Sequence, residues 1–394
     1  MPGSIKTLLE KVFNNVRACF FFFVQQAVLA VSEEGGDRPE SVLVVRLDAI
    51  GDFVLWVESA KALRKLYPSD KFCLTLLCNQ IVGDLAVSLG IFDEIWHLDR
   101  RKFSKNLTYR ILQLRKIQKA SFGIAINPTQ AREFMYGDSV IFATGADQRI
   151  GSKGNLLNLG VWQKRISDRW YTSLVAATPG LNVLEQNAEF LRGLGVTHAK
   201  PKIPDLPVST ESVPDLDIPD YFVVFPGAGA VLRQWPIERF AEVADRISSA
   251  TGWTGVICGG PGEETLGALL EDKAGVSLKN LVAKTTLPEL VSIIAGAHLV
   301  LANETSAVHI AAAVSTPSVC ILGGGHYGNF LPYPVMEESS KPSPIVVSRR
   351  SECFGCNWKC PSCAPNRVAD CIEGISVEEV WCAVKEILPT GFRS

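Results

Sequence analysis

The sequence predicts an α/β protein made of two Rossmann-like domains that face each other across a cleft. Apolar runs of strand length alternate with segments of helical periodicity along most of the chain, which is typical of parallel, doubly wound sheets. Glycine-rich or carboxylate-bearing turns follow several of these runs, at the place where such sheets bind ligands. A chain of 394 residues also exceeds the usual size of a single hydrophobic core.

Composition places the domain boundary. Five prolines fall within one short span, and such a span is typical of a linker: Pro201, Pro204, Pro207, Pro214 and Pro219. We therefore expect an N-terminal extension over 1–40, a first Rossmann-like domain over 41–200, a linker over 201–219, and a second Rossmann-like domain over 220–394. The second domain ends in a cluster of cysteines.

Periodicity and turn residues predict the individual elements. In the first domain, strands are expected at 42–45, 72–77, 94–98 and 123–126, and helices from about 53 to 66 and at 83–90, 100–119 and 182–194. In the second domain, strands are expected at 221–225, 255–258, 299–302 and 318–322, and helices at 237–250, from 287 onward, and after Thr305.

Charge limits the partners. The formal net charge of -2 excludes a generally basic, nucleic-acid-like surface, so no nucleic acid partner is expected. One segment, 100–119, nevertheless holds eight basic residues and no acidic one: Arg100, Arg101, Lys102, Lys105, Arg110, Arg115, Lys116 and Lys119. It is either a solvated helix face or a docking face for an anionic acceptor or membrane surface.

The amino-terminal segment 18–31, ACFFFFVQQAVLAV, is too short to span a bilayer and is interrupted by Gln25 and Gln26. It is either a peripheral, interfacial helix or a helix that packs on the core. Scattered cysteines in apolar runs, Cys73, Cys78, Cys258 and Cys320, indicate reduced, buried thiols. We therefore expect a cytoplasmic protein, with the inner face of the cell membrane as its place of contact if the first helix is interfacial.

The first predicted strand ends in a turn with two carboxylates. Asp48, Gly51 and Asp52 fall within five residues, between the strand and the helix that follows it. A carboxylate at the carboxyl end of a parallel strand is well placed for chemistry. Either aspartate could instead serve only to cap the helix.

Two further turns in the second half point to an anion site. Gly227 and Gly229 follow a strand, but PGAGA lacks the dinucleotide fingerprint, so a turn whose amides approach a phosphate is the simpler interpretation. Arg233 could supply a forked cation for a diphosphate, or could be an ordinary exposed arginine. In NETSAVHIAAA, Thr305 or Ser306 can cap a helix whose free amides bind anions.

His309 follows in the same segment, where it could face a ligand or pack beneath the turn; packing is slightly favoured. Gly323, Gly324 and Gly325 end the next strand and are expected to keep the backbone close to any ligand.

Four motifs, in order, resemble glycosyltransferase family 9, the ADP-heptose:lipopolysaccharide heptosyltransferase family, which has the GT-B fold. They are RLDAIGD at 46–52, PGAGAVLRQWP at 226–236, GGPGEE at 259–264 and NETSAVHIAAAVSTPSV at 303–319. The resemblance runs from about Ser41 to Leu388. It implies that Asp52 is the general base and that Arg233 contacts the donor phosphates.

With this resemblance, the candidate site residues form two groups. The donor-binding candidates are Gly227, Gly229, Arg233, Glu263, Glu304, Thr305, Ser306 and His309. The acceptor-binding candidates are Arg46 and Gly51. One departure concerns Glu304-Thr305-Ser306, because the family usually has Asp-Thr-Gly there.

The implied function is inverting glycosyl transfer. A sugar, heptose from ADP-heptose, would move to a lipopolysaccharide-core or related anionic glycan or glycolipid acceptor, with no cofactor required for catalysis. Two other functions stay open at this point. One is a nucleotide-sugar epimerase of GT-B type, and the other is a non-catalytic, metal-binding scaffold.

The cysteine cluster, CFGCNWKCPSCAPNRVADC, has a density typical of tetrahedral thiolate sites. Cys353, Cys356, Cys360 and Cys371 are the expected ligands of a structural zinc or iron ion, with Cys363 spare. The spacing matches no standard zinc ribbon, so free or disulfide-linked thiols are the alternative.

Overall fold

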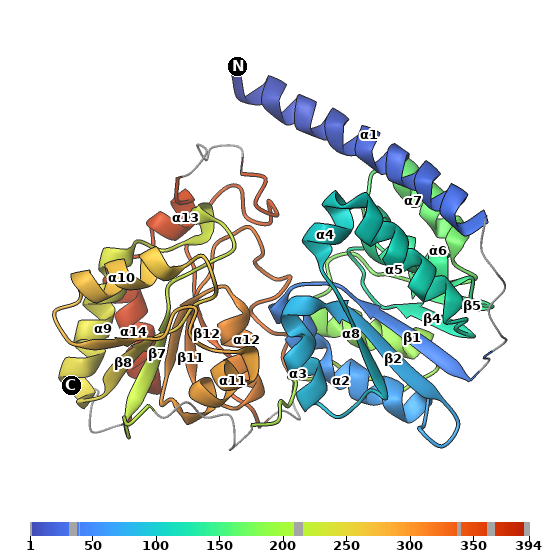
Figure 1. Cartoon of the computed structure of the whole chain (residues 1–394). Coiled ribbons are helices and arrows are strands. Elements are labelled where there is room, and N and C mark those ends of the chain that lie inside the picture. Colours follow the sequence, from blue (N-terminus) through green and yellow to red (C-terminus); the bar gives the residue numbers. More distant parts are fainter. Residues whose placement is uncertain are drawn as a thin grey trace. The chain divides into compact units, whose positions relative to one another are not determined.

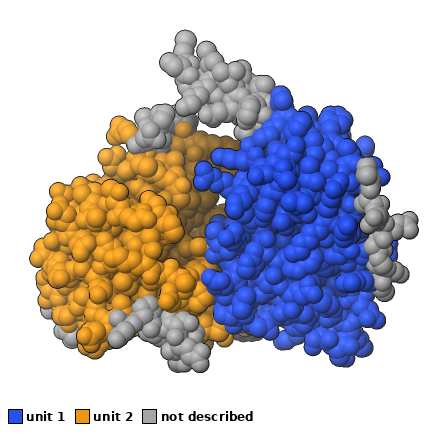
Figure 2. All heavy atoms as spheres, viewed as in Figure 1, with its two compact units in different colours: residues 1–49, 59–179, 186–199 blue, residues 50–58, 180–185, 200–394 orange. Residues whose placement is uncertain are grey.

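The structure is a computed structural model that describes residues 2–30, 38, 40–208, 216–336, 340–360 and 367–389. Two compact units make up the chain, and each is built on a six-stranded sheet whose strand pairs are all parallel (Figures 1 and 2). The first unit comprises residues 1–49, 59–179 and 186–199. The second comprises residues 50–58, 180–185 and 200–394, so it includes the first turns of the helix that follows the first strand.

The sheet of the first unit has the strand order β3-β2-β1-β4-β5-β6. Its strands are β1 Ser41–Arg46, β2 Cys73–Asn79, β3 Glu94–Leu98, β4 Ile124–Asn127, β5 Gln148–Ser152 and β6 Ser173–Val175. The helices of this part of the chain are α1 Pro2–Ala30, α2 Ile50–Leu66, η1 Gln80–Val82, α3 Gly83–Ser88, α4 Arg100–Lys105, α5 Leu107–Lys119, η2 Phe134–Asp138, α6 Ser139–Thr144, α7 Val161–Ser167, η3 Asp168–Trp170 and α8 Val183–Gly193.

The second sheet has the order β12-β11-β10-β7-β8-β9. Its strands are β7 Tyr221–Phe225, β8 Thr254–Ile257, β9 Leu278–Asn280, β10 Val300–Asn303, β11 Ser318–Ile321 and β12 Ile345–Val347. Its helices are η4 Val231–Arg233, α9 Ile237–Thr251, α10 Glu264–Lys273, α11 Leu287–Gly296, α12 Ser306–Ala313, α13 Asp370–Glu373 and α14 Val377–Ile387.

Both sheets have the classical dinucleotide-fold topology. In each, the strand order reverses beside the unit's own first strand, between β1 and β4 in one sheet and between β7 and β10 in the other. At such a switch point the loops after two neighbouring strands diverge, which leaves a crevice at the carboxyl ends of the strands. The topology therefore directs attention to the residues after β1, β4, β7 and β10.

Strand β1 shows why an unbroken apolar run becomes a central strand. Every residue from Ser41 to Arg46 is buried, and β1 pairs with β2 on one side and β4 on the other. A strand covered on both faces needs apolar side chains at successive positions rather than alternate ones. β7 follows the same rule, with all five residues buried.

Most of the predicted strands and helices are confirmed within a few residues, and the differences have local causes. The basic segment forms two helices rather than one, because Asn106 ends α4 and its side chain accepts the Tyr109 amide at the start of α5 (2.9 Å). The strands β5, β6, β9 and β12 were not predicted, and three of them are only three residues long. Cys73 is exposed, not buried as expected, whereas Cys78, Cys258 and Cys320 are buried free thiols.

The amino-terminal helix α1 packs on the first unit, alongside α5 (Figure 1). Ala18, Phe21 and Gln25 are buried against that unit. The Gln25 side chain donates to the Ser139 carbonyl oxygen (3.2 Å), and Phe22 stacks on Trp170. Among the described residues, no helix is both long and apolar enough to cross a membrane.

Candidate functional site

The switch point of the second sheet is held together by one buried amide. The Asn303 side chain at the end of β10 donates to the Pro226 carbonyl oxygen (2.7 Å) and accepts the Trp235 backbone N–H (3.1 Å). Asn303 is fully buried, so both bonds lie away from water. They join the glycine-rich turn after β7 to the start of α9 and fix the edge where the anion site was predicted. The sequence analysis did not single out Asn303.

Arg233 lies at this edge and is already oriented by an acidic partner. Its Nη2 donates to the Glu304 carbonyl oxygen (2.9 Å) and to the carboxylate Oε2 (3.1 Å). Its Nε is buried and has no hydrogen-bond partner, and its Nη1 lies beside Gly229. Arg233 is therefore held on one side by Glu304, with Nη1 next to the glycine turn.

Glu304 stands where the resemblance described above leads one to expect an aspartate, and its longer side chain contacts two polar groups. It is 5% exposed and contacts Arg233 through Oε2 and His326 Nδ1 through Oε1 (3.1 Å). Two polar partners satisfy a carboxylate that would otherwise be costly to bury. His326 belongs to the site but was missed, because it comes from the loop after β11 and nothing near it in the sequence marks it.

Glu263 lies over the two glycine turns. The Gly260 N–H donates to its Oε2 (2.8 Å), and a Cβ atom placed on Gly227 would overlap its carboxylate. A Cβ atom on Gly259 would come within 2.8 Å of the same group. Burial raises the pKa of Glu263, with the bond from Gly260 opposing the shift. Gly227 is therefore required by the close approach of Glu263.

Helix α12 begins at this edge as expected. Thr305 is its N-cap, and the Thr305 hydroxyl accepts the Ala307 N–H (3.4 Å). Ser306 is the first residue of the helix and is partly exposed. The free amides of a first helical turn favour an anion. Thr305 and Ser306 therefore lie where the sequence placed a phosphate site.

The first turn of α2 packs directly against the first turn of α12. A Cβ atom on Gly51 would lie 3.2 Å from His309 Cδ2 and 3.7 Å from Ser306 Cα. Gly51 thus lets two helix starts approach closely, within the second compact unit. Asp52, the next residue, is partly exposed and lies in the first turn of α2. The N-cap of α2 is Ala49, so neither Asp48 nor Asp52 occupies the capping position.

His309 packs beneath these helix starts. It is buried, and its Nδ1 lies 2.8 Å from the Tyr333 hydroxyl. Burial lowers its pKa to about 4, an effect that the Glu304 carboxylate partly opposes. The imidazole is therefore neutral near pH 7, and it supports the contact with Gly51.

In the first unit, Arg46 and Asp48 form an ion pair at the carboxyl end of β1. Arg46 Nε lies 3.0 Å from Asp48 Oδ2, which also accepts the Thr129 hydroxyl (3.2 Å). Thr129 follows β4, so the pair lies at the switch point of the first sheet. Arg46 is buried by this arrangement.

A second polar cluster near this switch point was missed. Arg132 and Asp138 are fully buried, and the Tyr171 hydroxyl donates to Asp138 Oδ1 (2.6 Å). Arg100 pairs with Glu133 (2.8 Å) in the same region. Arg100 and Tyr171 lie more than thirty residues from the other three in sequence, and none of the five sits in a recognisable motif, so only the folded chain brings them together.

The cysteine cluster is only partly assembled. Cys353, Cys356 and Cys371 are free thiols, and the Gly324 N–H donates to the Cys371 sulfur (3.3 Å). Cys360 is disulfide-bonded, and Cys363 lies outside the described residues. Within the described residues, no group of three or more His, Cys, Asp or Glu side chains is arranged to hold a metal ion. The structure therefore does not bring the four predicted ligands together.

Gly323, Gly324 and Gly325 have a different neighbour from the one expected. A Cβ atom on Gly325 would lie 2.5 Å from Trp358 Cδ2, and one on Gly324 would overlap the Phe354 ring. The cysteine-rich segment covers these glycines, so they make room for aromatic side chains rather than for a ligand.

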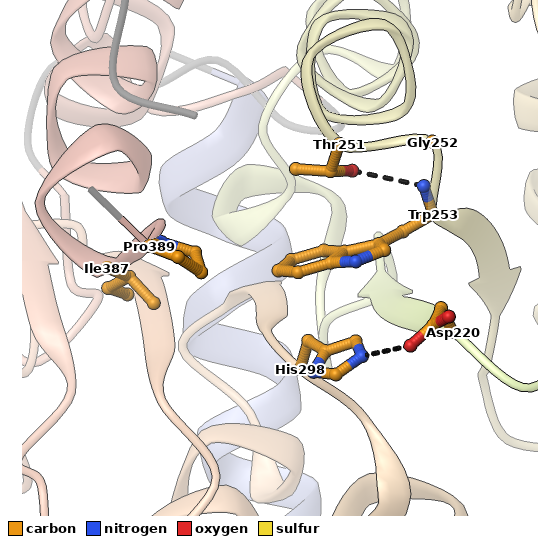
Figure 3. Close-up of a pocket in the computed structure, with 7 residues that line it drawn as sticks. All are labelled: Asp220, Thr251, Gly252, Trp253, His298, Ile387 and Pro389. Carbon is orange, nitrogen blue, oxygen red and sulfur yellow. Dashed lines mark hydrogen bonds and ion pairs between the residues drawn. The ribbon is translucent and has the colours of Figure 1, made fainter. Parts of the chain in front are cut away.

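A pocket of about 470 Å³ lies at the amino ends of the strands of the second sheet, opposite the candidate site (Figure 3). Asp220, Trp253 and His298 line it, and they come just before β7, β8 and β10. His298 stacks on Trp253 and its Nε2 lies 2.8 Å from Asp220 Oδ1. Because ligands of such sheets bind at the carboxyl ends of the strands, this pocket is separate from the candidate site.

Comparisons with known proteins agree with this architecture. A family model described as glycosyltransferase family 9 (heptosyltransferase) matches residues 161–340. Lipopolysaccharide heptosyltransferase 3 of Escherichia coli is 30% identical over 294 residues, which cover 69% of this chain and 80% of that protein.

Two solved structures share the fold. E. coli ADP-heptose lps heptosyltransferase II matches with a TM-score of 0.64 at 15% identity, covering 88% of this chain and 98% of that one. The iron-containing dodecameric glycosyltransferase TibC from enterotoxigenic E. coli H10407 matches with a TM-score of 0.51 at 14% identity, covering 90% and 77%.

Two Rossmann-like units, each with a parallel six-stranded sheet, and the similarity to solved heptosyltransferase structures define a protein of the GT-B fold class. The chain belongs to glycosyltransferase family 9, the heptosyltransferase family. The family, the fold class and the transferase class expected from the sequence are thereby confirmed.

The buried state of His309 predicts a pH dependence of stability. The folded imidazole has a pKa of about 4, whereas the ordinary value is 6.5, so the unfolded chain binds the extra proton first as pH falls. Stability is lost as pH falls from about 6.5 toward about 4. We expect this one group to account for about 2 kcal/mol between about pH 7.5 and about pH 5. Urea unfolding of the wild type and His309→Gln at both pH values measures it, and an equal pH dependence in the two proteins would contradict the assignment.

Proposed function

We propose that the protein transfers heptose from ADP-heptose to a lipopolysaccharide-core or related anionic glycan acceptor, with inversion at the anomeric carbon. One arrangement carries the proposal. The glycine turn, Arg233 and the start of α12 converge at the second switch point, and the first turn of α2, which bears Asp52, packs on α12 through Gly51. The names of the related heptosyltransferases support the choice of donor and acceptor.

The donor diphosphate would lie between the glycine turn and the start of α12. Arg233 Nη1, next to Gly229, would meet one phosphate, and the amides of Ser306 and Ala307 would meet the other. Glu304 holds the guanidinium in place, so little side-chain freedom is lost on binding. Glu263, over the turns, is placed to accept hydroxyl donors of the nucleotide sugar.

Asp52 would act as the general base. Its carboxylate would take the proton of the acceptor hydroxyl while the hydroxyl oxygen forms a bond to the anomeric carbon from the face opposite the diphosphate. The bond between that carbon and the phosphate oxygen breaks, and ADP leaves with the electron pair. Arg233 and the helix amides would stabilise the negative charge of the leaving diphosphate, so we propose no cofactor for this step.

The acceptor would be bound at the end of β1 and the start of α2. Arg46 and Gly51 stay the predicted contacts. Because the ion pair with Asp48 buries Arg46, we propose that Arg46 acts through the shape of this turn rather than as a free cation. A glycolipid acceptor lies in a membrane surface, so we also propose peripheral membrane contact for the chain.

For the cysteine cluster we propose a structural zinc or iron ion held by Cys353, Cys356, Cys360 and Cys371. Three of these are free thiols, and Cys371 is buried beside the Gly324 amide. Soft thiolates are the donors that zinc and iron prefer. The disulfide at Cys360 has to be reduced before this sulfur can bind a metal. The site lies outside the reacting groups, so its role is structural.

Metal analysis of the protein purified without oxygen tests this site. We expect about one zinc or iron ion per chain and its loss in Cys371→Ser, since one of four thiolate ligands is removed. Cys382→Ser is the control, because Cys382 is an exposed thiol on α14. Clearly substoichiometric metal in the wild type would rule the site out.

The role of Asp52 is tested by Asp52→Asn. The amide keeps the size of the side chain but cannot accept the acceptor proton, so we expect kcat to fall at least about a hundredfold. Binding of ADP, measured by calorimetry, should stay within about threefold of the wild type. Asp84→Asn is a matched control, because Asp84 is the exposed first-turn aspartate of α3. Turnover of Asp52→Asn close to that of the control would show that Asp52 is not the base.

A further inference from the structure

The outer face of α1 carries an apolar stripe that the protein leaves uncovered. Val16, Phe20 and Phe23 are 63%, 53% and 68% exposed, and their spacing places them on one side of the helix. Residues on the opposite side, Ala18 and Phe21, are buried against the first unit. The helix is thus apolar on both sides, although only one side faces protein.

The neighbouring helices α4 and α5 carry a basic surface. Helix α5 packs against α1, where the Arg110 guanidinium lies over the Phe21 ring (4.9 Å) and the Gln118 side chain donates to the Leu29 carbonyl oxygen (3.3 Å). The exposed cations of α4 and α5 are Arg101, Lys102, Lys105, Arg115, Lys116 and Lys119. No acidic residue occurs between positions 100 and 119.

We infer that this surface, the outer stripe of α1 with the exposed cations of α4 and α5, docks on an anionic lipid bilayer. Aromatic side chains on one face of a helix enter the boundary between headgroups and acyl chains. Lysine and arginine beside them are attracted by anionic headgroups. An anionic bilayer is a better partner than a second copy of this chain, because the same basic surface on the second copy would repel the first. The inference rests on the peripheral membrane contact proposed above and names the surface that makes it, while the donor site in the second unit is tested separately.

Vesicle flotation with the full chain tests the surface. We expect the protein to bind vesicles of phosphatidylglycerol and phosphatidylcholine in equal parts, and to bind pure phosphatidylcholine at least about tenfold more weakly. Phe20→Ser with Phe23→Ser should weaken binding at least about tenfold, because both rings lose their contact with the acyl region. Lys105→Gln with Arg115→Gln and Lys119→Gln should weaken binding to the anionic vesicles only.

The matched control is Leu269→Ser, an exposed leucine on α10 of the second unit. Circular dichroism verifies that each variant is folded. Absence of wild-type binding to anionic vesicles, or unchanged binding of the two multiple variants, would overturn the inference. A dimer in sedimentation that is lost in the Phe20/Phe23 variant, without vesicle binding, would assign the stripe to a second copy instead.

A second, independent observation concerns the cysteine loop, residues 353–360. The Gly355 and Asn357 N–H groups donate to the Gly324 and Gly325 carbonyl oxygens (2.7 and 2.9 Å), which fastens the loop to the end of β11. Asn357 and Trp358 have φ values of 48° and 58°, in the left-handed region that such residues rarely adopt. This backbone conformation fixes the position of the Trp358 ring.

The Trp358 ring lies at the candidate donor site. The Arg233 guanidinium carbon lies 5.3 Å from the centre of the Trp358 ring, within the range of a cation–π contact. The same ring meets His326 edge to face at 5.7 Å. Trp358 therefore contacts both groups that flank Glu304, and it comes from a loop more than a hundred residues after Arg233.

We propose that Trp358 is a positioning residue, which holds Arg233 and His326 in place for the donor diphosphate. This proposal rests on the proposed function of the site. It gives the cysteine loop a part in donor binding, because the loop conformation sets the position of the ring. It also accounts for the three glycines after β11, which leave the space that Trp358 and Phe354 fill.

Calorimetric titration with ADP tests this role. Trp358→Ala should weaken ADP binding about five- to tenfold, and Trp358→Phe should restore it to within about twofold, because a ring face is enough for the contact. Phe354→Ala is the matched control, because Phe354 belongs to the same loop as Trp358. Phe354 packs on Gly324 and Tyr327, and none of its described contacts is with Arg233. It should bind ADP like the wild type.

An equal loss of affinity in Phe354→Ala and Trp358→Ala would show that loop integrity, not the Trp358 ring, is what matters. Unchanged binding in Trp358→Ala would also overturn the proposal. Trp253→Ala changes a tryptophan at the amino ends of the strands, far from Arg233 in the sheet. It shows how much ADP affinity changes when a tryptophan is removed elsewhere in the unit (Figure 3). Failure of the wild type to bind ADP at all would instead contradict the proposed function.

Discussion

The buried side chain of Asn303 makes the contacts on which the candidate site of the second unit depends. Its amide donates to the Pro226 carbonyl oxygen, and its own oxygen accepts the Trp235 N–H, so it ties β10 to the loops on either side of Arg233. An asparagine with neither bond would leave two backbone groups and an amide unpaired in the interior, which is expensive. The bonds therefore fix where the glycine turn ends and where α9 begins. Because Arg233 lies between these two fixed points of the chain, its side chain is held close enough to donate to Glu304.

The arginines at the two switch points differ in how far they are removed from solvent. In the first unit, Arg46 pairs with Asp48 and its side chain is 4% exposed. In the second unit, Arg233 pairs with Glu304, but its side chain is 22% exposed and its Nη1 lies beside the glycine turn. An anionic group can reach a partly exposed guanidinium without first displacing its carboxylate partner from a buried site. We therefore assign the proposed diphosphate contact to Arg233 rather than to Arg46.

Sequence reasoning located the strands and turns because those depend on neighbouring residues. The run at 42–45 and the glycines at 227 and 229 could be read from composition alone. The contacts of Arg233 with Glu304 and Trp358 could not, since they join segments about seventy and more than a hundred residues apart. Short strands such as β6 were missed because three residues carry too little periodicity.

The amino-terminal helix packs on the core, as one of the two interpretations of this segment predicted. Its inner side is part of the first unit's core, where Phe21 covers the guanidinium of Arg110. That guanidinium has no carboxylate partner among its described contacts; it donates to the Met135 carbonyl oxygen and the Ser139 hydroxyl and lies over the Phe103 ring, while its Nε is buried without a hydrogen-bond partner. Burial lowers the pKa of Arg110 to about 10, which still leaves it charged near neutral pH. Phe21 and Gln25 are buried on this side of α1, and the Gln25 side chain donates to the Ser139 carbonyl oxygen. These contacts hold the helix in one rotation, which turns Phe20 and Phe23 outward.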